Sequence, residues 1–343
     1  MTEPEGGTAA RVTLSEVADV AGVSRAAASL ALRGKPGVAE MTRQRILTVA
    51  SDLGYRVRPF AIAPATGTIG LLVKSRPVDV GTPNAFYGEV IAGISQACAE
   101  SELDLRLDTM AVDEHFDPVE VPRMIQTADI DGLIVLGAFL SAPAGTMIGE
   151  QPVILVDGYA AEPNTFASIV SDNVGGTASA TRHLIELGHR RVALVGTSPD
   201  TFPSIVERRR GYQSAMTAAR LEAVYVDAAH DDPTACAAAT ARMLAADPSV
   251  TALVAANDAV ALTLLAELPD RVPREISVVG FDDIEAAGMI RPRLDTVAVD
   301  KRAMGRLAVS LLRHRIANPG DPSFTLVQHA RLIIRESSAP PPR

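Results

Sequence analysis

Residues 12–55 have the sequence VTLSEVADVAGVSRAAASLALRGKPGVAEMTRQRILTVASDLGY, and this stretch decides the fold of the N-terminal part of the chain. Its pattern of apolar, capping and glycine residues predicts three short helices. The first covers residues 14–21, because Thr13 can cap its N-terminus and Glu16, three residues later, completes a capping box. The other two helices follow after glycine-containing turns.

The turn after the first helix is the most informative position in this stretch. Gly22 tolerates a positive φ, and Ser24 can cap a second helix over residues 25–32. Two helices joined by such a turn are typical of the helix-turn-helix motif, which places its second helix in the major groove of DNA. A third helix over residues 40–53 is predicted from one apolar face, formed by Ile46, Leu47, Ala50 and Leu53. A small three-helix bundle without a DNA role also fits this pattern.

The distribution of charge favours the DNA-binding interpretation. Residues 11–58 hold eight basic and four acidic side chains, whereas the whole chain of 343 residues has a net charge of −9. A basic module on an acidic body is suited to binding phosphates.

The same segment resembles the DNA-binding head of the lactose-repressor (LacI-type) family of bacterial transcription regulators. The matching residues are Thr13-Leu14, Val17-Ala18, Ala21-Gly22-Val23-Ser24, Ser29, Gly34, Thr42-Arg43, Ile46 and Leu53-Gly54-Tyr55-Arg56. The resemblance implies a head of about 55 residues that contacts DNA grooves and phosphates. It also implies a hinge and a core similar to periplasmic sugar-binding proteins.

Seven residues of the head are expected to contact DNA. Arg25, Ala26 and Ser29 occupy the outward positions of the second helix, and Arg25 can donate two hydrogen bonds to guanine. A phosphate contact by Arg25, without base reading, is the alternative. The expected DNA-binding residues are Thr13, Ser24, Arg25, Ala26, Ser29, Arg33 and Tyr55.

The segment after the head, residues 58–67, is predicted to be a hinge. In the resembling family this segment forms a short helix on DNA and inserts an apolar side chain into the minor groove. Here Pro59 and Pro64 leave scarcely one helical turn, and Phe60 and Ile62 are the apolar candidates. An extended linker that never becomes helical is the alternative.

Composition sets the frame for the remaining chain. A length of 343 residues predicts more than one domain, and a hydrophobic share of 47% is ample for buried cores. The two cysteines show no metal or disulfide spacing, which fits the cytoplasm. Residues 1–10 and 337–343 are predicted to be flexible tails, and neither a signal peptide nor a membrane-spanning stretch is predicted.

Residues 68–336 alternate between apolar runs and helical stretches. Strands are expected at 68–73, 104–110, 132–137, 153–157, 169–172, 192–196, 252–256, 277–281 and 296–299, and helices at 86–100, 175–187, 204–219, 234–246 and 258–268. This alternation predicts an α/β core of two lobes, each a doubly wound parallel sheet, with a ligand cleft at the carboxyl ends of the strands.

The core also resembles the effector-binding domain of the LacI-type family. The matching stretches include Thr68–Val73, Asp131–Val135, Asp172-Asn173, Leu187–Gly196, Gly211-Tyr212, Asn257-Asp258 and Val279–Asp283. The resemblance implies that the lobes are discontinuous in sequence, with crossings near residues 160, 296 and 322.

Four polar residues are candidates for holding a ligand in the cleft. Asp157, Asn257 and Asp282 each follow or end a predicted strand, and Arg208 lies early in a helix. Carboxylate, amide and guanidinium groups suit a hydroxyl-rich molecule. The alternatives are that Asp157 caps a turn, Asp282 caps a helix, and Arg208 belongs to a charged surface run. The resemblance adds Asn84 and Phe86 as effector-binding residues.

The sequence therefore predicts a cytoplasmic, ligand-responsive transcription regulator that binds a palindromic operator as a homodimer. The resemblance implies that it acts as a repressor. The effector is a sugar by default, although Val299 stands where relatives often have glutamine. Residues 86–100 and 284–294 are the expected dimer interface. A core that serves only for dimerisation, or a solute-binding protein, are the rival interpretations. No motif for catalysis, a cofactor or a metal site is found in the sequence.

Overall fold

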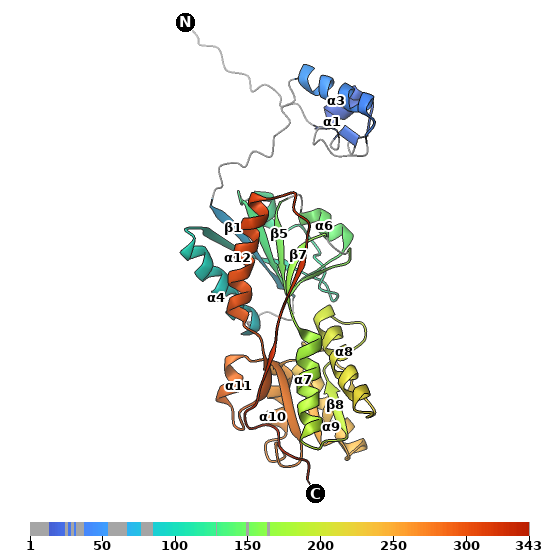
Figure 1. Ribbon diagram of the computed structural model, residues 1–343, viewed down its shortest axis with the longest axis vertical. Helices are drawn as coiled ribbons and strands as arrows, with labels where there is room; N and C mark the ends of the chain where they lie inside the picture. The colour runs from blue at the N-terminus through green and yellow to red at the C-terminus, as the bar shows by residue number, and fades with distance from the viewer. Residues whose placement is uncertain are drawn as a thin grey trace. The chain divides into compact units, whose positions relative to one another are not determined.

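The computed structural model describes residues 14–24, 27, 28, 31, 38–53, 67–76, 85–127, 129–148, 151–162 and 165–342. The chain divides into two compact units, Met1–Ala65 and Thr66–Arg343. Figure 1 shows the arrangement of the helices and strands and labels many of them.

The first unit is helical where it is described. α1 covers Leu14–Ala21 and α3 covers Glu40–Asp52, and residues 27, 28 and 31 between them are also helical. Their inward side chains form one small core made of Val17, Ala18, Ala21, Ala28, Ala31, Ile46 and Ala50. Leu47 was predicted to face this core, but its side chain is 44% exposed. At 3.6 residues per turn, the position next to Ile46 is rotated away from the buried face.

The turn after α1 has the predicted geometry. Gly22 has a φ of +64°, which a residue with a Cβ rarely adopts. The Val23 amide donates to the Ala18 carbonyl oxygen at 3.0 Å. Ser24 then caps the following helix, because its hydroxyl oxygen accepts a hydrogen bond from the Ala27 amide at 3.1 Å.

The second unit contains two lobes, each built on a six-stranded sheet. The N-terminal lobe has the parallel strand order β13-β7-β5-β3-β1-β2. Its strands are β1 (Thr68–Ser75), β2 (Asp104–Ala111), β3 (Gly132–Leu136), β5 (Val153–Val156), β7 (Ala167–Ser171) and β13 (Thr325–Gln328). Its helices are α4 (Ala85–Glu100), α5 (Arg123–Thr127), α6 (Ala142–Ile148) and α12 (Lys301–Ala317). The short strands β4 (Phe139–Leu140) and β6 (Tyr159–Ala160) pair beside it.

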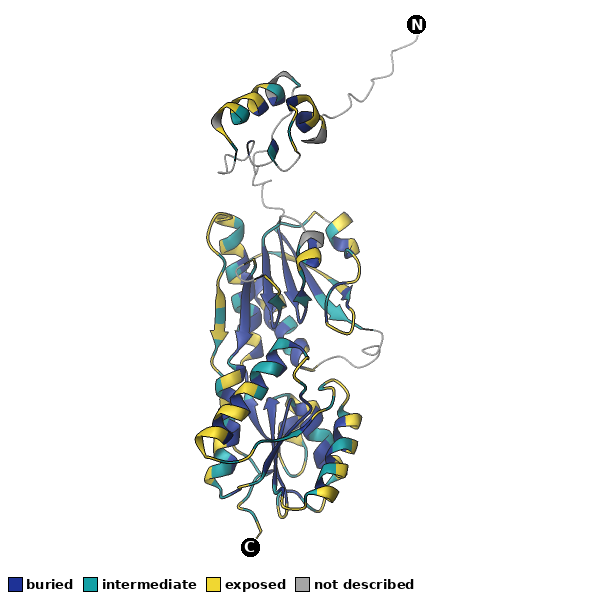
Figure 2. Cartoon of the chain, turned by 90° about the vertical axis from the view of Figure 1, so that its right-hand side faces the viewer, coloured by how far each residue is buried: buried dark blue, intermediate teal, exposed yellow. Residues whose placement is uncertain are grey.

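The C-terminal lobe repeats this design. Its strand order is β14-β12-β11-β10-β8-β9, parallel except that β14 runs antiparallel to β12. The strands are β8 (Val192–Val195), β9 (Val224–Val226), β10 (Ala252–Ala255), β11 (Ser277–Asp282), β12 (Asp295–Ala298) and β14 (Arg331–Ile333). The helices are α7 (Asn173–Glu186), α8 (Pro203–Ala218), α9 (Pro233–Ala246), α10 (Asp258–Glu267) and α11 (Glu285–Met289). Figure 2 shows the central strands of both sheets as buried. The predicted doubly wound, two-lobed core is therefore confirmed.

The chain passes between the lobes at three places. β7 belongs to the N-terminal sheet and β8 to the C-terminal sheet, so the first crossing follows residue 171. The second follows β12 at residue 298, and the third lies between β13 and β14, after residue 328. The crossings expected near 160 and 322 fall before the ends of β7 and β13, whereas the one expected near 296 falls within β12. The resemblance indicated their number, but the ends of β7 and β13 set their positions.

Two glycines bring α4 and α12 into backbone contact. A Cβ on Gly93 would lie 2.2 Å from the Arg302 carbonyl oxygen, and one on Gly305 would lie 2.2 Å from the Val90 carbonyl oxygen. Because no side chain separates the two helices at this crossing, they form one rigid layer on the N-terminal sheet.

The C-terminal segment is ordered where it is described, contrary to the prediction of a flexible tail at 337–343. Ser337 is fully buried, and its hydroxyl donates to the Val278 carbonyl oxygen at 2.6 Å. The Ser337 hydroxyl oxygen also accepts a hydrogen bond from the Asp295 amide at 2.7 Å. The Ala339 carbonyl oxygen lies 2.9 Å from Nε2 of His189. Serine- and proline-rich composition suggested disorder, but these polar groups find partners on the C-terminal lobe.

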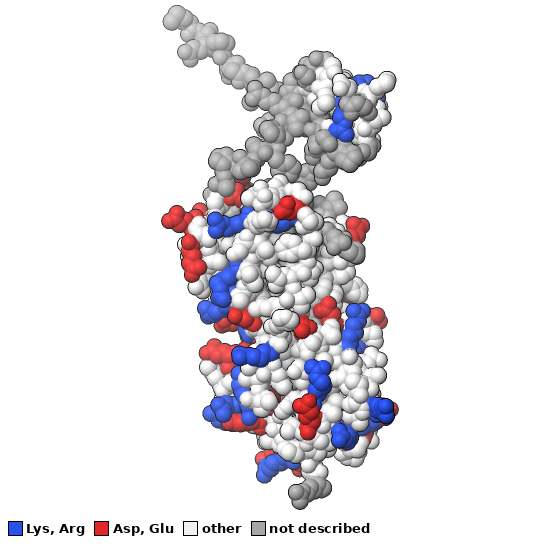
Figure 3. Space-filling model, in the orientation of Figure 1, with Lys and Arg blue, Asp and Glu red and all other residues white. Residues whose placement is uncertain are grey.

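The surface of the second unit carries no single dominant sign of charge on the face shown in Figure 3, where basic and acidic side chains alternate. Within the part of the chain that the structure describes, none of the helices combines the length and apolar character that crossing a membrane requires.

Candidate functional site

Two predicted ligand-binding carboxylates lie at strand ends with unusual backbone geometry. Asp157 directly follows β5 with a φ of +46°, and Asp282 ends β11 with a φ of +115°. Both are about 9% exposed. Residues other than glycine rarely adopt a positive φ, and those that do are concentrated at functional sites. The strand ends therefore hold both carboxyl groups in fixed directions.

Arg208 of α8 links the elements of the C-terminal lobe that face the N-terminal lobe. Its guanidinium donates to Oδ1 of Asn173 at 3.0 Å, to the Ala256 carbonyl oxygen at 2.6 Å and to Oδ1 of Asp282 at 3.3 Å. It also lies over the ring of Phe281, 3.7 Å from the centroid. The residue is 6% exposed, so the alternative that it belongs to a charged surface run is wrong.

Within the N-terminal lobe, an aromatic residue of α4 holds Asp157 in place. The Tyr87 hydroxyl on α4 donates to Oδ2 of Asp157 at 2.9 Å. Burial raises the pKa of Asp157, while the charges of Arg208 and Lys74 oppose that rise. Burial, followed by the negative charge of Asp157, also raises the pKa of Tyr87 well above its usual range. Tyr87 therefore remains a hydrogen-bond donor.

Asp282 interacts electrostatically with Asp157 and Arg208. Burial raises its pKa to about 6, against the lowering effects of Arg208 and Lys301, and the charge of Asp157 raises it further. Asp157, Arg208 and Asp282, three residues predicted from the sequence, are thus brought together by the fold.

Polar side chains also connect the two lobes directly. The Tyr159 hydroxyl, on β6 of the N-terminal lobe, donates to Oε2 of Glu207 at 3.0 Å. The side-chain amide of Asn173 donates to the same oxygen at 2.9 Å. Sequence reasoning missed Tyr87, Tyr159, Asn173 and Glu207 as members of this site. Asn173 lies in a motif shared with the family, and that motif was the available signal.

The other predicted effector-binding residues have different surroundings. Asn257 caps α10 by accepting from the Val260 amide at 2.9 Å, and its amide donates to the His230 carbonyl oxygen at 2.9 Å. Phe86 is buried and packs edge-to-face against Tyr87, with ring centroids 5.4 Å apart. Ligand contact by Asn257 and Phe86 stays a prediction, and Asn84 lies outside the described residues.

The predicted DNA-contacting and hinge residues lie outside the described residues, with the exception of Ser24. The residues outside are Thr13, Arg25, Ala26, Ser29, Arg33, Tyr55, Phe60 and Ile62. The Ser24 side chain caps the second helix, so a DNA contact by its hydroxyl would be additional to this role.

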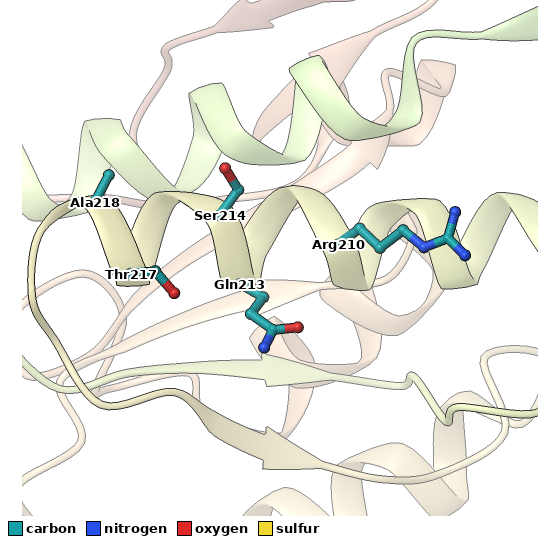
Figure 4. Close-up of a pocket in the computed structure, with 5 residues that line it drawn as sticks. All are labelled: Arg210, Gln213, Ser214, Thr217 and Ala218. Atoms are coloured by element: carbon teal, nitrogen blue, oxygen red, sulfur yellow. The ribbon is translucent and has the colours of Figure 1, made fainter.

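A separate hollow lies along α8, away from the strand ends. It is lined by Arg210, Gln213, Ser214, Thr217 and Ala218, whose side chains are drawn in Figure 4. None of the predicted effector-binding residues lines it. The strand ends between the lobes therefore remain the candidate site.

Comparison with known proteins agrees with this architecture. Residues 13–57 match the model of the bacterial regulatory proteins of the lacI family, and residues 181–338 match that of the periplasmic binding protein-like domain. The chain is 31% identical over 344 residues to the HTH-type transcriptional regulator CelR of Thermobifida fusca. This alignment covers 95% of the present chain and 98% of the relative. The chain is 28% identical over 340 residues to the ribose operon repressor of Haemophilus influenzae, with the same coverage.

A solved structure shows the same arrangement. The complex of the transcriptional regulator CelR with cellobiose superposes with a TM-score of 0.67 at 29% identity, covering 95% of this chain and all of the other. These relatives are named as transcription regulators and not as enzymes. The helix-turn-helix head, the two-lobed core and the match over nearly the full length place this chain in the lacI family of bacterial transcription regulators.

Proposed function

We propose that this ligand-responsive regulator binds a neutral, hydroxyl-rich small molecule, a sugar by default, between its two lobes, and that binding changes its affinity for a palindromic operator. The observation that carries the proposal is the buried group of Asp157, Arg208 and Asp282, held at strand ends where the lobes face each other. Such strand ends are the usual ligand position in open α/β sheets.

The chemistry of this group suits hydroxyl groups. Each ligand hydroxyl can donate to a carboxylate and accept from a guanidinium, and hydrogen bonds to charged groups are the stronger ones. Asp157, Asp282 and Glu207 supply three carboxylates, and Lys74, Arg208 and Lys301 supply three cations that act on them. Because these charges balance, a charged ligand would add an unpaired charge to a buried site, which costs free energy. A neutral ligand would not.

The relatives support the sugar class. The solved complex of CelR contains cellobiose, and the relative from Haemophilus influenzae is named for the ribose operon. Both sugars are neutral and rich in hydroxyl groups. We extend this ligand class, although not a particular sugar, to the present chain.

Regulation would follow from the connection between the cleft and the head. A homodimer presents two heads to two half-sites, which sets their spacing. The candidate interface is α4 together with residues 284–294. A ligand that binds one angle between the lobes more tightly shifts the population toward it, and the separation of the heads then changes. Acting on chromosomal DNA, the protein would work in the cytoplasm, most simply as a repressor.

Titration calorimetry of the full-length protein tests the ligand proposal. The panel contains neutral mono- and disaccharides, nucleosides and small organic acids. We expect binding by a neutral sugar, loss of that binding in Arg208→Met, and retention in Arg210→Met, which changes an exposed residue of the same helix. The affinity for operator DNA, obtained by selection from random duplexes and measured by fluorescence anisotropy, should differ with and without that sugar. No binding across the panel would favour a core that serves only for dimerisation.

A further inference from the structure

An ammonium group and three aromatic rings meet where the two lobes face each other. Nζ of Lys74, near the end of β1, lies 4.2 Å from the ring centroid of Phe116, 5.0 Å from that of Phe202 and 5.5 Å from that of Tyr87. Phe116 and Tyr87 belong to the N-terminal lobe, whereas Phe202 precedes α8 of the C-terminal lobe. The side chain of Lys74 therefore touches rings from both lobes.

The rings also contact each other across the lobe boundary. Phe116 and Phe202 pack edge-to-face with centroids 4.9 Å apart, and Tyr159 meets Phe202 at 5.6 Å. Phe116 and Phe202 are 4% and 3% exposed and form one buried cluster with Ile205 and Ala256. Separating the lobes would return this apolar surface to water, which is unfavourable.

An ion pair closes the same region. The Arg76 guanidinium, two residues after Lys74, contacts the Asp231 carboxylate of the C-terminal lobe. The Arg76 guanidinium also lies over the Phe116 ring, 5.0 Å from its centroid. The side chains of Arg76 and Asp231 are only 13% and 23% exposed, so solvent screens this pair less than it would a surface pair.

We propose that Lys74, Phe116 and Phe202, together with the Arg76–Asp231 pair, form a latch that holds the lobes closed without an effector. All of its groups are side chains of this chain, and none of the three predicted residues Asp157, Arg208 and Asp282 belongs to it. An effector therefore enters only when the latch opens, and the open fraction scales its apparent affinity. Lys74 also acts on the charge of Asp157 in the proposed ligand site. The latch is therefore tested without any ligand, by the distance between the lobes, so that its failure and the failure of the proposed function can be told apart.

Distance measurements on the full-length, ligand-free protein test the latch. Spin labels are placed on introduced cysteines at Thr109 in the N-terminal lobe and Ala245 in the C-terminal lobe, both exposed. The buried Cys98 and Cys236 are replaced by alanine. Excess unlabelled chain ensures that only distances within one chain are measured by double electron–electron resonance. We expect one short-distance population in the otherwise unchanged protein.

The variants separate the cation from the rings. Lys74→Met keeps a similar stem without the charge and should raise the ratio of open to closed chains roughly tenfold, because a desolvated cation–π contact is lost. Phe202→Leu should act in the same direction, whereas Lys74→Arg should retain the short distance. Arg106→Met on β2, an exposed position, is the matched control and should change nothing. Unchanged distances in both Lys74→Met and Phe202→Leu, or an open population in the parent protein, would overturn the proposal.

Discussion

The buried carboxyl group of Asp258 predicts an unusual dependence of stability on pH. Asp258 is fully buried at the start of α10, where one oxygen accepts from the Thr296 hydroxyl at 2.6 Å and the other from the Ile284 amide at 2.9 Å. Burial, followed by the negative charge of Asp282, raises its pKa to about 8. Gly280 allows this close approach, since a Cβ there would lie 2.2 Å from Oδ1.

The sign and size of the effect follow from proton linkage. The ordinary pKa of an aspartate is 3.8, so between pH 4 and 8 the folded chain keeps a proton that the unfolded chain has lost. The contribution of Asp258 to stability is thus fully present below the unfolded pKa and is lost as the pH rises through the folded one. Between pH 6 and pH 8 the loss is about 2 kcal/mol, from a slope of about 1.4 kcal/mol per pH unit that flattens near the folded pKa.

Asp258→Asn removes the titrating group and tests this reasoning. The free energy of unfolding is measured by urea denaturation at pH 6, 7 and 8, followed by circular dichroism. The free energy of unfolding of the parent protein, minus that of Asp258→Asn, should fall by about 2 kcal/mol from pH 6 to pH 8. Asp247→Asn is the control, because hydrogen bonds from Ser249 and Arg191 lower the pKa of that half-buried carboxyl and leave it ionised throughout. A constant difference between the parent and Asp258→Asn from pH 6 to 8 would refute the reasoning.

Three further substitutions have definite expectations. Arg208→Met should lower the free energy of unfolding by about 3–5 kcal/mol, since the buried oxygens of Asn173, Ala256 and Asp282 lose the guanidinium that donates to them. Arg210→Met should change it by less than about 0.5 kcal/mol, and equal urea curves for the two variants would contradict this. Ser337→Ala removes two buried hydrogen bonds and should cost about 1–3 kcal/mol in the same assay, whereas a flexible tail would give no loss. Ser24→Ala should destabilise the head by about 1 kcal/mol and weaken operator binding in anisotropy titrations near its melting temperature, and unchanged binding there would argue against the cap.

The parts of the fold that the sequence predicts well are those with a local physical signature. Gly22 follows the end of α1 with a positive φ, and the predicted bounds of this helix match the structure. Buried parallel strands are continuous apolar runs, so strands such as Gly132–Leu136 and Val192–Val195 are found within a residue or two of their ends. These signals act over a few residues and do not require knowledge of distant contacts.

The elements that the sequence does not reveal depend on distant partners. β13 and β14 lie at sheet edges and consist of exposed and half-buried residues, so they lack a buried apolar run. β9 has only three residues, of which one is buried. The C-terminal segment is ordered by Asp295, Ser277 and His189, which are more than 40 residues earlier in the chain.

The candidate site shows the same division. The rule that ligands lie beyond strand ends identified Asp157 and Asp282, because strand ends can be read from the sequence. Lys74 and Phe202 gave no such signal, since their contact joins residues from different lobes. Asn257 also follows a strand, but its side chain caps the next helix. Position at a strand end thus predicts which residues lie where the two lobes face each other, but not how the neighbouring side chains use their hydrogen bonds.

The contacts of Lys301 suggest how a change at the end of β11 would reach the rest of the core. Its buried ammonium donates to the carbonyl oxygens of Asp282 at 2.5 Å and of Asp283 at 2.9 Å, so it fixes the end of β11 to the start of α12. That start is also the second crossing between the lobes. Because α12 and α4 touch through their backbones at Gly93, they should move together when the end of β11 moves. A shift of Asp282 on ligand binding would then reach α4, the helix expected at the dimer interface, without passing through any loop.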